Sequence, residues 1–119
     1  MTATPIDANN YCKKILDLDP QIRFVGKIVN DQLVTSARKE GIIPLLDKQL
    51  ADLAHHQVIV KAMMDKMFTD KTGKTDWIVE SKGKVKLVTI FQEDGILILS
   101  TEPTSDHHSI IEKIKNIKM

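Results

Sequence analysis

The stretch Asp94-Gly95-Ile96-Leu97-Ile98-Leu99 decides the fold of this 119-residue chain. Asp-Gly is a two-residue turn signal, and the four residues that follow it are all apolar. Successive side chains of a strand point to opposite faces of a sheet, so a continuously apolar strand is buried on both faces. We therefore expect residues 96–99 to form a central strand of a sheet whose two faces are both covered.

Four other segments have the composition of strands. Two of them precede the central strand, one at residues 77–79 and one at residues 85–91. An earlier pair runs over residues 22–28 and 33–38, and its first member alternates apolar and basic side chains. Asn30-Asp31 can form the tight turn of this hairpin, because both residue types tolerate positive φ. The sequence thus predicts five strands.

Three segments have helical spacing. The first runs from about Pro5 to Leu18 and ends at Asp19-Pro20, because the residue before a proline is pushed out of the helical region. The last follows Glu102-Pro103, and its apolar stripe consists of Ile110, Ile111, Ile114 and Ile117. The longest, from about Pro44 to Phe68, lies between the hairpin and the remaining strands.

The longest predicted helix carries two apolar faces. One stripe consists of Leu46, Leu50, Leu53, Val60, Met64 and Met67, with Gln57 at the missing step. The other set, roughly opposite, consists of Ala51, Val58, Ile59 and Ala62, with His55 among them. A surface helix needs one apolar stripe to pack on its own domain. The second set therefore either covers more of the same domain or meets a partner.

The order helix, two strands, helix, three strands, helix resembles that of the roadblock/longin-like fold, a relative of profilin. The expected class is α/β (α+β), in three layers, with a five-stranded, mostly antiparallel sheet and helices on both faces. Residues 22–46 are also similar to a group of small archaeal proteins of unassigned function. No linker or repeat interrupts the chain, so residues 1–119 are interpreted as a single roadblock/longin-like domain.

The resemblance implies an interaction module. Roadblock-like proteins typically dimerise by joining edge strands and neighbouring long helices, and the dimer binds small GTPases or other signalling regulators. The residues expected at the dimer interface are Val58, Ile59, Ala62, Met63, Trp77 and Val79. Trp77 could instead shield the sheet edge or pack in the core. The alternative function is a sensor that binds a small ligand or a metal between sheet and helix.

Composition argues against several classes of partner. The net charge is +1, whereas nucleic-acid binding needs a concentrated basic surface. The lysines at alternate positions, Lys82, Lys84 and Lys86, are expected on a solvated strand face. No apolar run approaches the roughly 20 residues that span a membrane, and no signal peptide is evident. With Cys12 as the only cysteine, a reducing cytoplasmic setting is expected.

The sequence contains no complete motif for phosphate binding or catalysis. Gly73-Lys74-Thr75 ends like a phosphate-binding loop, but the required earlier glycine is replaced by Phe68, and a strand rather than a helix follows. Cys12 lies on the apolar face of the first helix and is expected in the core. We expect no catalytic residue and no cofactor.

Four histidines occur as two adjacent pairs, His55-His56 and His107-His108. Neighbours on a helix diverge by about 100°, so neither pair is a chelate by itself. A metal site would require the two pairs to meet in space or across a dimer axis.

Overall fold

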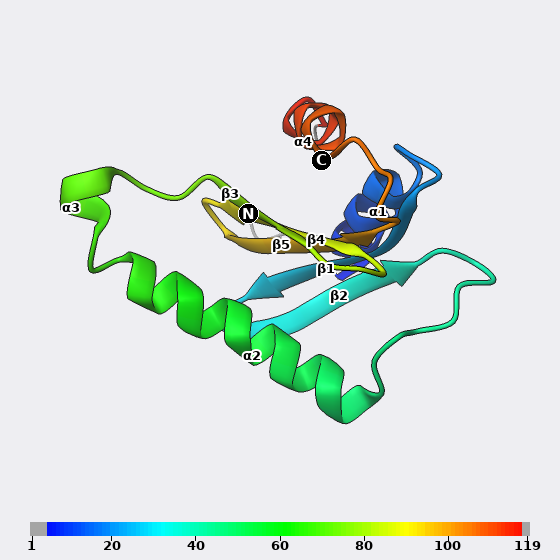
Figure 1. Cartoon of the computed structure of the whole chain (residues 1–119), viewed down its shortest axis with the longest axis horizontal. Helices are drawn as coiled ribbons and strands as arrows, with labels where there is room; N and C mark the ends of the chain where they lie inside the picture. Colours follow the sequence, from blue (N-terminus) through cyan, green and yellow to red (C-terminus); the bar gives the residue numbers. More distant parts are fainter. Residues whose placement is uncertain (1–4, 118–119) are drawn as a thin grey trace.

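The computed structural model describes residues 5–117, with side chains described from Asn10 onward. The elements, in chain order, are α1 (Pro5–Leu16), β1 (Ile22–Val29), β2 (Gln32–Arg38), α2 (Lys48–Asp65), α3 (Thr69–Thr72), β3 (Trp77–Ser81), β4 (Lys86–Gln92), β5 (Gly95–Thr101) and α4 (His107–Lys115). They form three layers, with the sheet between α2 on one side and α1 and α4 on the other (Figure 1).

The five strands lie in the order β2-β1-β5-β4-β3, and every neighbouring pair is antiparallel. The central position of β5, beside β1, confirms the prediction from its continuous apolar run. Leu97 and Leu99 are buried on one face, and Ile98, between them, is buried on the other. The α/β class with a five-stranded sheet is therefore as the sequence predicted.

Of the two predicted hairpin turns, one lies where the sequence placed it and the other lies one residue earlier. Asn30 and Asp31 have φ values of 51° and 63°, which is the conformation of a tight β-hairpin turn. The turn predicted at Asp94-Gly95 consists instead of Glu93 and Asp94, because Gly95 already pairs with Gln92 as the first residue of β5. Gly95 has a φ of 157°, and a Cβ atom there would lie 2.2 Å from the carbonyl oxygen of Ile28. Only glycine fits that position, so the Asp94-Gly95 signal also reflects the close approach of β1.

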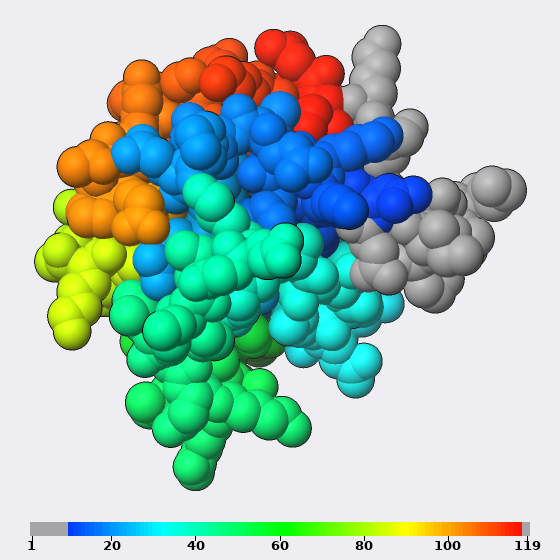
Figure 2. All heavy atoms as spheres, turned by 90° about the vertical axis from the view of Figure 1, so that its right-hand side faces the viewer, coloured from blue at the N-terminus to red at the C-terminus, as the bar shows by residue number. Residues whose placement is uncertain are grey.

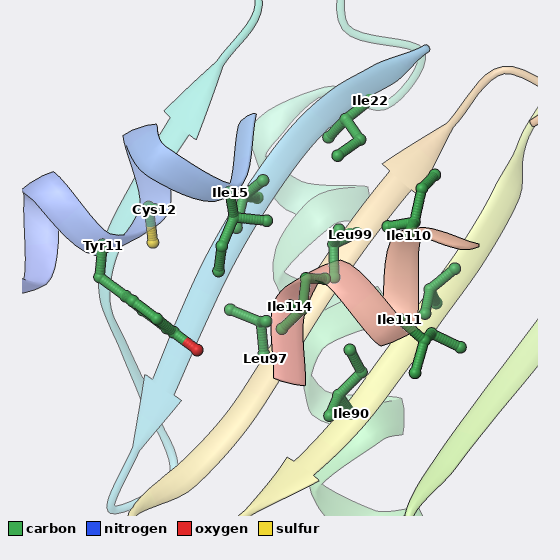
Figure 3. Packing of buried hydrophobic residues seen from close by; sticks show 12 residues of the cluster. Tyr11, Cys12, Ile15, Ile22, Ile90, Leu97, Leu99, Ile110, Ile111 and Ile114 are labelled. Carbon is green, nitrogen blue, oxygen red and sulfur yellow. The ribbon is translucent and has the colours of Figure 1, made fainter. Parts of the chain in front are cut away.

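The hydrophobic core lies between the sheet and the pair α1 and α4 (Figure 3). It consists of Tyr11, Cys12 and Ile15 from α1, Ile110, Ile111 and Ile114 from α4, and Ile22, Val25, Val88, Ile90, Leu97 and Leu99 from the sheet. The predicted stripe of α4 thus faces inward, and Cys12 is fully buried, as expected for a core residue.

The helix predicted over residues 44–68 is shorter than expected. Asp47 caps α2, because its side chain accepts a hydrogen bond of 2.9 Å from the backbone N–H of Leu50. At the other end the backbone tightens into i to i−3 hydrogen bonds at Met67 and Phe68, and the one-turn helix α3 follows. The helix is therefore bounded by the Asp47 cap at its start and by the tightened hydrogen bonds at its end. The apolar pattern in the sequence continues across both boundaries and does not reveal them. The first helix also ends two residues earlier than predicted, at Leu16.

Candidate interaction surface

A row of exposed side chains, apolar except at Gln57, follows the solvent side of α2 and continues past its end to Met67. Leu50, Leu53, Val60, Met64 and Met67 are 38–77% exposed, and no residue of α2 is buried. We refer to these five residues, together with Gln57, as the outer row. Their steps along the chain alternate between three and four residues, which is the spacing of a coiled-coil seam. Monomeric proteins rarely expose such a continuous apolar surface, which is typical of an interaction site.

The outer row continues beyond both ends of the helix. Ile43, Leu45 and Leu46 in the loop before α2 are 80%, 53% and 45% exposed, and Phe68 after it is 55% exposed. In Figure 2 the loop and the start of α2, coloured blue-green to green, project from the body of the molecule. Of the large exposed hydrophobic residues in the described part of the chain, only Leu33 and Val34 lie outside residues 43–68.

The opposite side of α2 rests on the sheet with small and half-buried side chains. Ala51, Val58, Ile59 and Ala62 are partly covered, as is His55. Of the two alternatives left open for this set, the structure therefore places it against its own domain. The stripe that would ordinarily be assigned to the core is instead the exposed one.

A shallow hollow of about 220 Å³ lies between α2 and the β1–β2 turn. Asp31, Asp52, His55 and His56 contribute its polar lining. Burial lowers the pKa of His55, and the nearby carboxylate of Asp52 partly opposes that shift. The neutral imidazole is thus favoured while α2 lies on the sheet.

Strand β3 forms one edge of the sheet and pairs only with β4 among the described strands. Trp77 and Val79 direct their side chains toward the core on the α4 side, away from α2. The Trp77 ring centroid lies 6.4 Å from that of His107 and 5.6 Å from that of His108. Trp77 therefore packs against the start of α4, while the backbone of its strand lies at the edge of the sheet.

The six residues expected at the interface are thus divided between two layers. Val58, Ile59 and Ala62 lie on the side of α2 that faces the sheet, and Trp77 and Val79 lie on the opposite face of the sheet. Met63 alone among the six presents a mostly exposed side chain, at 60%. The outer row was visible in the sequence as a helical stripe, but its periodicity alone does not distinguish a face that meets the sheet from one that meets solvent.

The two histidine pairs lie on opposite sides of the sheet, since His55 and His56 belong to α2 and His107 and His108 to α4 (Figure 1). Within residues 5–117 no group of three or more histidine, cysteine, aspartate or glutamate side chains is arranged to hold a metal ion. Burial, Lys86 and His108 lower the pKa of His107, with Asp106 opposing them.

The other sequence motifs have structural positions. Lys82 and Lys84 are exposed, but Lys86 is half-buried and donates a hydrogen bond of 2.7 Å to the carbonyl oxygen of Ser105. The expectation that all three lysines share a solvated face was therefore wrong for Lys86. Gly73-Lys74-Thr75 follows the short α3 and leads into β3, without a helix N-terminus that could hold a phosphate.

Two further observations concern the only cysteine and the lengths of the helices. Burial raises the pKa of the Cys12 thiol, which keeps it protonated and unreactive. No helix within the described residues is long and apolar enough to cross a bilayer.

No protein-family model and no curated protein sequence matches this chain. Solved structures are nevertheless similar to it. MglB of Myxococcus xanthus superposes with a TM-score of 0.71 at 17% identity, over 97% of this chain and 84% of that one. A Roadblock/LC7 domain from Streptomyces avermitilis gives 0.68 at 12% identity, over 90% and 88% of the two chains. The gliding protein MglB from Thermus thermophilus gives 0.68 at 13%, over 98% and 89%. The chain therefore has the roadblock fold.

Proposed function

We propose that this chain is a non-enzymatic interaction module that forms a homodimer and presents the dimer to a small GTPase or another signalling protein. The observation that carries the proposal is the outer row of α2, a continuous apolar surface on an otherwise ordinary charged exterior. Such a surface is stable in water only when another protein covers it for much of the time.

The edge strand β3 supports the same assembly. Its free side carries unpaired backbone N–H and C=O groups from Trp77 to Ser81, which a second copy of the strand can satisfy. A symmetric dimer is the commonest way for a protein to close such an edge. In this arrangement Trp77 and Val79 contribute backbone groups, and Met63 contributes a side chain.

The half-buried residues of α2 have an indirect part in the proposed interface. Val58, Ile59 and Ala62 hold the helix against the sheet, and the position of the helix decides where the outer row points. The association with a small GTPase rests on the resemblance to roadblock-like proteins alone. The fold does not by itself determine the partner.

The proposal is tested by placing a charge in the middle of the outer row. Leu53→Glu would bury a carboxylate in the interface, and the cost of desolvating it should convert the dimer to a monomer. Asn10→Glu is the matched control, because Asn10 is exposed on α1, on the other side of the sheet. Sedimentation velocity over a concentration series measures both variants.

Two results decide the matter. A dimer for the unmodified chain and for Asn10→Glu, with a folded monomer for Leu53→Glu, would support the proposal. An unmodified chain that sediments as a monomer at every concentration would contradict it. Circular dichroism of Leu53→Glu establishes that the variant remains folded.

A further inference from the structure

A second hollow lies on the face of the sheet opposite α2, where α1 and α4 diverge. It measures about 330 Å³, and its lining includes Tyr11, Ile90, Phe91, Gln92, Ile114 and Ile117. Figure 3 shows Tyr11 reaching from α1 across β1 toward Leu97 and Ile114. The hollow therefore combines apolar walls with the polar groups of Tyr11, Gln92, Asp76 and Lys115, and small-molecule sites likewise place a few polar groups among apolar ones.

Gln92 and Tyr11, two polar residues of the lining, are connected through hydrogen bonds to the buried Lys27. Lys27 is 5% exposed, and its ammonium donates to the Asp94 carboxylate at 2.8 Å and to the Gln92 side-chain oxygen. The Gln92 amide nitrogen in turn donates to the Tyr11 hydroxyl oxygen at 2.8 Å. These contacts link β1, β4 and α1 at the end of the sheet near the β4–β5 turn.

The direction of every hydrogen bond in this chain of contacts is fixed by chemistry. An ammonium group only donates, so the Gln92 oxygen must accept from Lys27. The Gln92 nitrogen can then only donate, so the Tyr11 oxygen must accept. The hydroxyl proton of Tyr11 is left to donate elsewhere, and no acceptor for it is found among the described residues.

Tyr11 is suited to remain a donor at neutral pH. Burial raises the pKa of its phenol above the ordinary value, and Asp94 adds to that effect, while the hydrogen bond from Gln92 opposes it. The side chain is 7% exposed and forms part of the lining of the hollow. A buried donor without an acceptor is unfavourable, and a ligand oxygen would relieve that cost.

We propose that this hollow is a binding site for a small, mainly apolar molecule whose carbonyl or carboxylate oxygen accepts the Tyr11 hydroxyl proton. The apolar part of the ligand lies against Ile90, Ile114 and Ile117. Lys115 supplies a cation and Asp76 a carboxylate to the lining, so the comparison of a charged with a neutral probe decides between a carboxylate and a neutral carbonyl. The site is separate from the outer row and does not depend on the chain being a dimer.

The test uses octanoate and octanamide as probes, which share an apolar chain and differ in charge. Titration of the full-length protein, followed by two-dimensional amide NMR, should shift resonances around the hollow, with saturation at millimolar probe. Tyr11→Phe keeps the ring and removes the donor, so it should weaken binding about tenfold, the effect of one lost hydrogen bond. Glu40→Gln, at an exposed position in the loop after β2, is the control and should bind like the unmodified protein.

The two probes distinguish a ligand with a carboxylate oxygen from one with a neutral carbonyl oxygen. Tighter binding of octanoate, with the preference abolished by Lys115→Gln, identifies a carboxylate ligand. Equal binding of both probes identifies a neutral carbonyl. Ile117→Trp, which enlarges a half-buried side chain of the lining, should block either probe. The inference is overturned if neither probe shifts the lining resonances, or if Tyr11→Phe binds as tightly as the unmodified protein.

Discussion

The two faces of the sheet differ in how completely the helices that cover them are buried. On the α1 and α4 side, Ile15, Leu97 and Ile110 have no exposed surface. On the α2 side the helix has no buried residue at all, and its outward stripe is as apolar as its inward one. The α1 and α4 side is closed by residues of the chain itself, whereas the α2 side leaves an apolar surface exposed to solvent, which we propose is covered by a second copy.

Because of this difference, apolar side chains on the two faces should contribute differently to the stability of the fold and to association. An isoleucine on α4 stabilises the fold, because its removal leaves a cavity among close-packed neighbours. A leucine in the outer row contributes little to the isolated fold and much to association. Substitutions of equal size on the two faces should therefore have opposite profiles in stability and in assembly.

The largest expected effect is on the closed face. Ile110→Ala should lower the free energy of unfolding by about 2–5 kcal/mol, since it removes a fully buried side chain and leaves a cavity. Urea denaturation of the variant, monitored by far-ultraviolet circular dichroism, measures the change. A loss below about 0.5 kcal/mol would mean that α4 is not packed as tightly as its burial indicates.

The matched change on the open face is Leu53→Ala. Measured at a concentration where the protein is monomeric, its free energy of unfolding should change by no more than about 0.5 kcal/mol. The dimer should weaken about tenfold or more, because a side chain at an interface loses roughly 1–3 kcal/mol of apolar burial. A stability loss as large as that of Ile110→Ala would show that α2 belongs to the monomer core and would remove the contrast between the faces.

The smallest effect concerns acid. The pKa values of His55 on α2 and His107 on α4 both lie below the ordinary value of about 6.5, with burial as the largest cause. Between the folded and ordinary pKa values the unfolded chain binds more protons than the folded chain, so stability falls as the pH drops through about 6.5.

Thermal unfolding at pH 7.5 and pH 5 should therefore show a lower midpoint in acid. His55→Gln and His107→Gln should each reduce the difference between the two midpoints. The sizes of the two reductions show how much the histidine on each face of the sheet contributes to the acid sensitivity. An acid shift that neither substitution alters would place its origin in other groups.

Much of this contrast was present in the sequence, and part of it was not. The continuous apolar run at residues 96–99 predicted the central strand, because no other position buries both faces. Asn30-Asp31 predicted its turn through local backbone preferences, whereas the turn predicted at Asp94-Gly95 lies one residue earlier, at Glu93 and Asp94. The order of elements then pointed to the roadblock fold, and the similarity to solved structures shows that fold.

The orientation of α2 could not be predicted in the same way. Both of its faces are apolar, so periodicity alone does not decide which meets the sheet. Small size is the physical signal that separates them: Ala51 and Ala62 allow close approach to the sheet, while leucine and methionine occupy the outer row. The hydrogen bonds that link Lys27, Gln92 and Tyr11 join residues 65 and 81 positions apart, so only the folded structure reveals them.

Hydrogen–deuterium exchange across a dilution series tests the central claim most directly. If a second copy completes the α2 face, amides of α2 and β3 should exchange faster as the protein is diluted into monomers, while those of β5 and α4 stay protected at every concentration. Protection of α2 and β3 that is independent of concentration, in a protein that stays monomeric, would contradict the account.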